Sequence, residues 1–180
     1  MATNRKYVRD GCDGAHYAKC IQRLKEWGAP LDGWRCIGII DVREDDREAP
    51  LSVCELCDCN KVRYEHIMEH DLYFETVTVG CICAGIMEGD VLKARERERL
   101  MRNRSRRRMT FVKHIWKQER WDVWYRTYRK KELVIRKTAG GYIALAGNRM
   151  AERYKGRPIR DFYSAIYAAF DLADPVEAVL

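Results

Sequence analysis

The chain has 180 residues, and its 34 Lys/Arg against 27 Asp/Glu give a net charge of +7. This length suits one ordinary domain, or two small domains that each need help to stay folded. No apolar run approaches the ~18–20 residues that cross a membrane, and the first ten residues lack the apolar core of a secretory signal. The sequence therefore predicts a cytoplasmic protein with no membrane partner.

Charge is distributed unevenly along the chain. Residues 1–92 carry 11 Lys/Arg and 17 Asp/Glu, a balance of −6, whereas residues 93–180 carry 23 and 10, a balance of +13. Such a split is typical of an acidic module joined to a module that meets a polyanion. We expect three parts, namely an acidic N-terminal module at 1–90, a basic connecting helix at 91–118 and a C-terminal module at 119–180.

The N-terminal module is expected to combine one helix with a small sheet. Apolar residues recur at helical spacing over residues 13–27, and a glycine and a proline then stop the pattern. Three later stretches are β-branched or alternate in polarity, which predicts strands at 34–42, 62–70 and 74–79.

The connecting helix is expected to begin after Asp90, a good N-cap residue, and to extend to about Trp116, because this stretch has neither Gly nor Pro. Between Lys93 and Arg108 it holds nine Lys/Arg and two Glu. A helix this polar has no apolar face to bury in that part. We therefore expect it to bridge modules or to lie on a partner.

The C-terminal module is predicted to be a small antiparallel sheet covered by one helix. Strands are indicated at 124–128, 132–137 and 142–146, with a fourth candidate at 149–154. A helix follows Asp161, which is placed to cap it, and a proline at position 175 ends it. The expected fold class is α+β, with a small zinc-stapled module, a long basic helix, and then this sheet.

Four cysteines in two close pairs are the most specific feature of the sequence. Cys54 and Cys57 form a C-x2-C pair, and Cys81 and Cys83 follow as a C-x-C pair. In a cytosolic protein, thiols gathered this tightly suit a tetrahedral Zn²⁺ site better than disulfides. We therefore predict that these cysteines hold a structural Zn²⁺ ion.

The sequence leaves more than one candidate for the fourth ligand of this site. In an extended C-x-C segment the two side chains point to opposite faces, but a helix that begins just after Cys83 could bend Cys81 and Cys83 inward. His66 and His70 lie between the two cysteine pairs and are the alternative ligands. The cysteines also fit a core that uses them as small hydrophobic residues.

A second metal site is a further interpretation of the N-terminal residues. Cys12, His16 and Cys20 are spaced along one helical face, and Cys36 would complete the set. The alternative is a helix whose inner face simply carries small residues, and this alternative is favoured.

Catalysis is not expected. A catalytic Zn²⁺ needs an open position and a nearby general base. Glu65 and Glu69 flank the histidines, but on the opposite face of the predicted strand. The sequence therefore predicts a protein that is not an enzyme and has no small-molecule substrate.

Arginine dominates the predicted connecting helix. Its planar fork matches phosphate oxygens, and only two glutamates are there to neutralise the charges. We predict that the helix binds the phosphates of DNA or RNA through Arg95, Arg99, Arg102, Arg104, Arg106, Arg107 and Arg108. The aromatic residues that follow, from Trp116 to Tyr128, are either stacking platforms for unpaired bases or core, and for the tryptophans core is favoured.

The motifs C-E-x-C, R-Y-x-H-x-M-x-H and G-C-x-C-A, followed by an Arg/Glu-rich helix, resemble a family of uncharacterised bacterial and phage-borne cysteine-rich proteins. The likeness runs from Trp34 to the stretch around Phe170, and the cysteine block is its most specific part. A Trp-x-x-Ser and Gly-Asn signature associated with such tails is not evident at 121–129. The resemblance implies zinc binding and a phage origin, and it implies no activity.

Two functions are consistent with these features. The first is a non-catalytic, zinc-stabilised protein that binds nucleic acid through the Arg-rich helix. The alternative is a phage-encoded inhibitor or adaptor that binds a host protein or nucleoprotein complex, with the acidic half as its docking surface.

Overall fold

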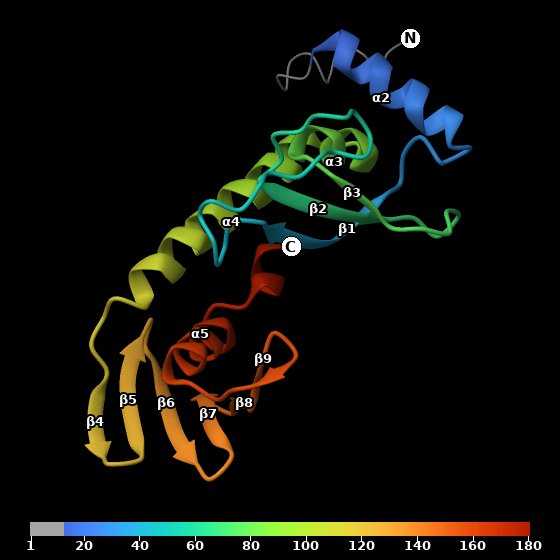
Figure 1. Cartoon of the computed structure of the whole chain (residues 1–180). Coiled ribbons are helices and arrows are strands. Elements are labelled where there is room, and N and C mark those ends of the chain that lie inside the picture. The colour runs from blue at the N-terminus through green and yellow to red at the C-terminus, as the bar shows by residue number, and fades with distance from the viewer. Residues whose placement is uncertain (1–12) are drawn as a thin grey trace. The chain divides into compact units, whose positions relative to one another are not determined.

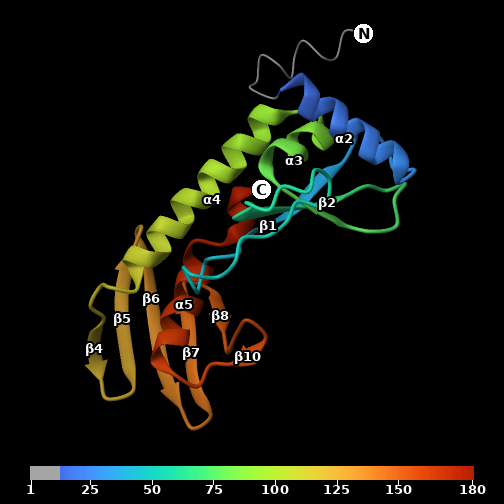
Figure 2. The same ribbon diagram turned by 45° about the horizontal axis from the view of Figure 1, so that its top comes forward.

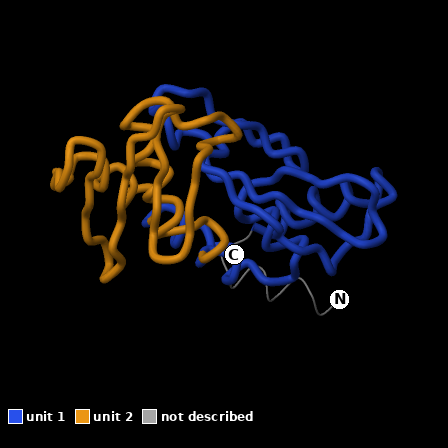
Figure 3. The backbone as a smooth tube through the Cα atoms, turned by 90° about the horizontal axis from the view of Figure 1, so that it is seen from below, with its two compact units in different colours: residues 1–103, 179–180 blue, residues 104–178 orange. Residues whose placement is uncertain are grey.

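Helices and antiparallel strands follow one another along the chain, and the computed structural model, which describes residues 13–180, confirms the expected α+β fold. The chain divides into two compact units, coloured separately in Figure 3. Unit 1 comprises the residues up to 103 together with 179–180, and unit 2 comprises residues 104–178. None of the helices in the described part of the chain is both long and apolar enough to cross a bilayer.

Unit 1 contains a small antiparallel sheet with a helix packed on one face (Figure 1). Its strands lie in the order β1-β2-β3 and span Arg35–Asp41, Tyr64–Glu69 and Val77–Val79. Strand β2 alternates as predicted, because Tyr64, His66 and Met68 are buried and the residues between them are half-buried. Met68 shares a hydrophobic cluster with residues of α3 (Cys81–Glu88), which packs on the buried face.

Helix α2 (Gly14–Glu26) lies beside α3, as Figure 2 shows. The Asp13 carboxylate caps it by accepting the amide hydrogen of Ala15 at 3.2 Å. Gly28 then takes a φ of +65°, which accounts for the predicted stop. The inner face of α2 places Cys20 and Leu24 in the core of unit 1.

Strand β3 is shorter than the predicted strand at 74–79. The residues before it form the β2–β3 loop, residues 70–76, in which Leu72 and Phe74 are 83% and 85% exposed. A strand begins only at Val77, which pairs with Met68. The sequence pattern did not distinguish an exposed loop with apolar residues from a strand.

A tight connection joins α3 to α4 (Val91–Phe111). Gly89 ends α3 with a φ of +79°, and the Asp90 carboxylate caps α4 by accepting the amide hydrogen of Lys93 at 2.9 Å. Gly85 lies against the start of α4, where a Cβ atom would come within 2.5 Å of the Val91 Cα. The predicted N-cap is therefore confirmed, while the helix ends five residues earlier than expected.

Helix α4 buries one face in spite of its polarity. Residues at every third or fourth position are buried, namely Val91, Ala94, Arg97, Met101, Arg104, Arg108 and Phe111. The expectation that the polar part of this helix buries no face is therefore wrong, because three arginines occupy buried positions.

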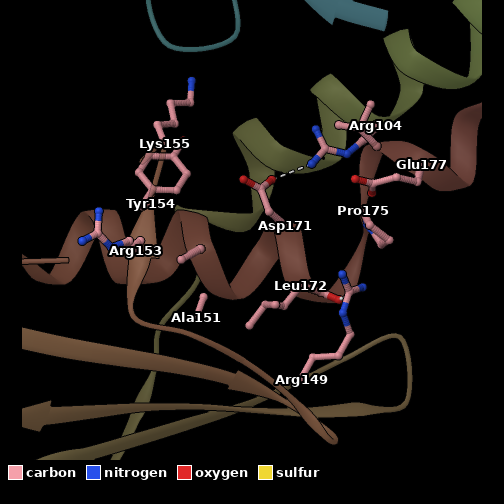
Figure 4. A pocket seen from close by; sticks show the side chains of 12 residues that line it. Arg104, Arg149, Ala151, Arg153, Tyr154, Lys155, Asp171, Leu172, Pro175 and Glu177 are labelled. Carbon is pink, nitrogen blue, oxygen red and sulfur yellow. Dashed lines mark hydrogen bonds and ion pairs between the residues drawn. The ribbon is translucent and has the colours of Figure 1, made fainter. Parts of the chain in front are cut away.

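Each buried arginine has a partner within its own unit. In unit 1, Arg97 forms an ion pair with the buried Glu88 at 2.6 Å. In unit 2, Arg104 is 1% exposed and pairs with Asp171 at 2.5 Å, as the dashed line in Figure 4 shows. The guanidinium of Arg108 donates to the Tyr154 hydroxyl and lies 4.0 Å from the centre of another tyrosine ring. These contacts offset part of the cost of burying charge, although Nε and Nη1 of Arg97 are buried without a hydrogen-bond partner among the described residues.

Unit 2 is a five-stranded antiparallel sheet with one helix on one face (Figure 1). Strands β4 to β8 are neighbours in chain order and span Lys117–Arg120, Val123–Tyr128, Lys131–Thr138, Gly141–Ala146 and Arg149–Ala151. A separate hairpin pairs β9 (Arg153–Tyr154) with β10 (Arg157–Pro158). The sequence predicted at most four strands in this sheet, and the fifth is β4. This strand was missed because its four residues are polar and exposed and show no apolar pattern.

Helix α5 (Phe162–Ala173) covers the inner face of this sheet and is capped as predicted, because the Asp161 carboxylate accepts the amide hydrogen of Ser164 at 2.8 Å. A short 3-10 helix spans Val176–Val179. The core under α5 includes Leu133, Ile135 and Phe170, with Phe111 packed among them.

We predict that Gly85→Ala destabilises unit 1 by about 2–3 kcal/mol, because the new Cβ overlaps backbone that a neighbouring side chain cannot relieve. Gly140→Ala is the matched control, since a Cβ there meets no atom within 4 Å, and its effect should stay below about 1 kcal/mol. Denaturant unfolding of both variants measures the difference. Equal free energies of unfolding would show that the α3–α4 contact is not as close as described.

Candidate metal centre and basic helix

A group of sulfur and imidazole ligands lies within unit 1, where α2, the β1–β2 loop and α3 meet. The ligand atoms of His16, Cys57 and Cys83 all lie within 4.8 Å of one another. The Cys83 sulfur is 3.4 Å from Nε2 of His16 and 3.7 Å from the sulfur of Cys20. Cys54 interacts with both Cys57 and Cys83. We call these five residues the cysteine cluster.

Local structure explains how each ligand reaches the cluster. His16 and Cys20 are four residues apart and therefore share the inner face of α2. The segment from Cys54 to Cys59 closes a turn, since the Cys54 amide donates to the Cys59 carbonyl at 2.8 Å and the Asp58 amide donates to the Cys54 carbonyl at 2.8 Å. Cys83 projects from the first turn of α3.

Helix α2 is also tied to this turn by charged side chains. The Lys19 ammonium donates to the Cys57 carbonyl at 2.5 Å, and the Arg23 guanidinium pairs with the Asp58 carboxylate at 2.5 Å. Because these side chains are partly or largely exposed, each pair contributes little stability by itself. Their effect is to fix which face of α2 meets the cysteines.

Backbone amides face the sulfur atoms of the turn. The amides of Cys57 and Gly80 donate to the Cys54 sulfur, the second at 3.4 Å, and the Cys59 amide donates to the Cys57 sulfur. Such hydrogen bonds favour the thiolate form over the thiol. The sulfurs of Cys54 and Cys57 therefore each accept backbone hydrogen bonds that suit a metal-bound thiolate, although burial raises the pKa of Cys57.

The thiols strongly influence one another's ionisation. Hydrogen bonding to Cys83, supported by the backbone amides and opposed by burial, lowers the pKa of Cys54 to about 5. Hydrogen bonds with Cys20 and Cys54, together with burial, raise the pKa of Cys83. The Cys54 thiol therefore loses its proton easily, whereas the Cys83 thiol keeps its proton. A bound cation would offset the charge of additional thiolates.

The cysteine cluster can hold a metal ion. Three sulfur donors, from Cys54, Cys57 and Cys83, and one imidazole nitrogen, from His16, form a donor set that suits a borderline or soft transition metal. Cys20 is fully buried behind Cys83 and is the other candidate for the fourth position.

The structure separates Cys81 from this group. Because α3 begins at Cys81 rather than after Cys83, the two cysteines lie two helical positions apart and project about 200° from each other. The Cys81 thiol is next to the Glu98 carboxylate of α4, and burial together with this carboxylate raises its pKa to about 12. It stays a neutral thiol away from the cluster.

The two histidines predicted as alternative ligands also lie elsewhere. His66 is fully buried, and burial, together with the nearby Arg97, lowers the pKa of its imidazole to about 4. Nδ1 of His70 accepts the amide hydrogen of Leu72 at 3.0 Å, and its ring lies 5.5 Å from that of Trp34. Neither belongs to the ligand group found around Cys83 among the described residues.

The proposed second site is not assembled by the described residues. His16 and Cys20 join the main cluster, whereas Cys36 donates its thiol hydrogen to the Gly38 carbonyl on β1. Cys12 lies outside the described residues, and Cys59 is exposed. The sequence interpretation did not link His16 to Cys57 and Cys83, although its spacing from Cys20 on one helical face indicated that both residues face inward.

The arginines of α4 fall into two classes. Arg104 and Arg108 are buried in unit 2, and Arg107 pairs with the buried Asp174 at 2.6 Å. The exposed arginines are Arg95, Arg99, Arg102 and Arg106, of which the first three belong to unit 1. The seven arginines predicted to bind phosphate therefore do not form one surface.

A hollow of about 300 Å³ in unit 2 is lined by several cations, including Arg149, Arg153 and Lys155 (Figure 4). These side chains do not point at a common centre in this view, and the Arg149 guanidinium donates to the Leu172 carbonyl at 3.1 Å. We assign no ligand to this hollow.

Comparison of the chain with protein-family models, with curated proteins and with solved structures gave no match. The resemblance noted in the sequence to a cysteine-rich bacterial and phage-borne family therefore stays a prediction.

We predict that Cys57→Ser and Cys83→Ser lose a bound metal ion, because each removes a sulfur from the centre of the cluster. Cys59→Ser and Cys81→Ser are the matched controls and should keep it, since both thiols lie outside the cluster. Metal content per chain, measured after gel filtration, separates the two outcomes.

His16→Ala should lower metal affinity more than Cys20→Ala, because His16 lies near both Cys57 and Cys83. Metal loss in Cys81→Ser together with full retention in His16→Ala would contradict the assigned ligands. It would restore the four-cysteine site expected from the sequence.

Proposed function

We propose that this protein is a non-catalytic nucleic-acid-binding protein in which Zn²⁺ stabilises unit 1 and the exposed arginines of α4 contact phosphates. The observation that carries the proposal is the sorting of arginines on α4. Arg95, Arg99 and Arg102 lie on the exposed face, whereas Arg97 turns inward to Glu88. The exposed face thus presents guanidinium groups at the surface, where a partner can reach them.

The three exposed arginines of α4 that belong to unit 1 form a short row. They are spaced at i, i+4 and i+7, which places them on one side of the helix over about 10 Å. Arg99 pairs with Glu96 at 2.6 Å and Arg102 with Glu98 at 2.7 Å. Ion pairs between exposed side chains contribute about 1 kcal/mol or less, so phosphates can replace these carboxylates at small cost.

Zn²⁺ is the metal that best suits the cysteine cluster. Three thiolates and one imidazole are a common ligand set of structural zinc sites. When bound, Zn²⁺ would neutralise the thiolates and link α2, the β1–β2 loop and α3. Four protein ligands leave no open position on a tetrahedral ion, which supports a structural rather than a catalytic role.

We predict that the triple variant Arg95→Glu, Arg99→Glu, Arg102→Glu binds nucleic acid at least about tenfold more weakly. It replaces three cations by anions at the row that meets the phosphates. Fluorescence anisotropy with labelled DNA and RNA, using nuclease-treated protein, measures the change. The fold should persist, because all three side chains are exposed.

The matched control reverses three exposed cations of unit 1 outside α4, namely Lys25→Glu, Arg47→Glu and Lys61→Glu. It changes the net charge equally, so it separates a local contact from a general effect of charge. Equal losses in both triple variants would contradict binding by the α4 row. Reversal of Arg104, Arg107 or Arg108 does not test binding, because these side chains hold unit 2 together.

One observation favours the alternative, a protein-binding adaptor or inhibitor encoded by a phage. The β2–β3 loop exposes Leu72 and Phe74 between the acidic residues Asp71 and Glu75. Exposed large apolar side chains with an acidic rim are typical of protein-docking surfaces. Because its charged residues are acidic, this loop would bind a basic surface of a host protein.

We predict for this alternative that a host protein co-purifies with the chain after nuclease treatment and is lost in Leu72→Ser, Phe74→Ser. Both side chains are more than 80% exposed, so the substitutions should leave folding intact. Affinity purification followed by mass spectrometry measures the loss. Retention of the same partner by the double variant would rule out this loop as the docking surface.

A further inference from the structure

We propose that the outer face of the five-stranded sheet in unit 2, the face turned away from α5, binds single-stranded nucleic acid by stacking on unpaired bases. This inference rests on the proposed function and adds to it a substrate class and a second surface. Unit 2 carries 18 Lys/Arg against 8 Asp/Glu, a balance of +10, which makes it the more basic of the two units. Such a charge favours a polyanionic partner.

Side-chain alternation defines which residues occupy the outer face. On β5, the ring of Trp124 lies 4.8 Å from that of Phe162 on α5, so Trp124 faces inward and its neighbour Tyr125 faces outward. On β6, Leu133 and Ile135 are fully buried, which turns Val134 outward. The same alternation applies to β7 and β8. Their buried or half-buried alanines face inward, so Ile143, Leu145 and Met150 face outward.

The strand register joins these outward residues into a row across the sheet. Lys117 is paired with Tyr125, Tyr125 with Val134, Val134 with Leu145, and Leu145 with Met150. Five strands about 4.8 Å apart give the row a length of about 19 Å. Its central residues are half-exposed, and Met150 at the edge is exposed. The row offers an apolar strip that begins with a cation and an aromatic ring.

A second row on the same face supplies more positive charge. Arg120 pairs with Val123, Val123 with Arg136, and Arg136 with Ile143. Both arginines are exposed. Glu132, opposite Thr127, is an acidic residue on this face, against three cations in the two rows. Cations alternating with apolar side chains match a strand whose phosphates and bases both face the protein.

A large exposed aromatic residue follows Arg120 in the turn after β4. Trp121 occupies the turn between β4 and β5 and is 75% exposed. The other aromatic rings of this region pack inside unit 2, as Trp116 and Trp124 do against Phe162. Tyr125 on the outer face and the exposed Trp121 in the adjoining β4–β5 turn are therefore the rings available to a base.

An unpaired strand fits this face better than a duplex does. A duplex keeps its bases stacked inside and presents mainly phosphates, which an apolar row does not bind. Single strands present base faces to aromatic and apolar side chains, with cations along the backbone. The sheet offers both kinds of group in neighbouring rows, and this supports the choice of a single strand.

The test measures the affinity of the full chain for labelled mixed-sequence single-stranded DNA, single-stranded RNA and a DNA duplex. We expect Trp121→Ala and Tyr125→Ala each to weaken single-strand binding about tenfold, because one base–aromatic stack is lost. Tyr125→Phe keeps the ring and should keep the affinity, which separates stacking from a folding defect. Duplex binding should be weaker in the wild type and unchanged in these variants.

Tyr163→Ala is the matched control, because Tyr163 is 70% exposed but lies on α5, on the other side of the sheet. It should bind like the wild type. Unchanged single-strand affinity in Trp121→Ala and Tyr125→Ala, combined with a loss in the α4 triple variant, would overturn this inference alone. A preference for duplex would also overturn it, and absence of all nucleic-acid binding would overturn the proposed function as well.

Discussion

The 3.6-residue repeat of α4 decides which of its arginines are buried, and much of the rest of the molecule depends on that division. A basic helix that packs against other elements has to bury some cations, and burial of an unpaired guanidinium costs several kcal/mol. Glu88 and Asp171 supply the required carboxylates within unit 1 and unit 2 respectively. The arginines on the opposite face are exposed and form the positive surface of the helix.

The cysteine cluster sets a similar constraint on the other elements of unit 1. Its ligands come from three segments of the chain, namely α2, the β1–β2 loop and α3. Without a cation, ionised thiols at these separations repel one another. A bound metal would turn that repulsion into a cross-link between α2, the β1–β2 loop and α3. These elements also share the hydrophobic cluster of unit 1, to which the cross-link would be added.

Local signals in the sequence were sufficient for much of the fold. Helices begin after Asp90 and Asp161 as predicted, since capping depends on neighbouring residues. The sequence could not show that Asp171 neutralises Arg104, because 67 positions separate them. The cysteine pairs were found by spacing, but the start of α3 at Cys81 determined which thiol of the second pair turns toward His16.

The salt dependence of nucleic-acid binding by the wild-type chain tests the central claim most directly. Purified, nuclease-treated protein would be titrated with a labelled single strand over a range of salt concentrations. Each neutralised phosphate contributes about 0.7 to the slope of log affinity against log salt, so the three exposed arginines of unit 1 predict a slope of about −2 or steeper. Absence of binding at low salt, or an affinity that salt does not change, would contradict the account.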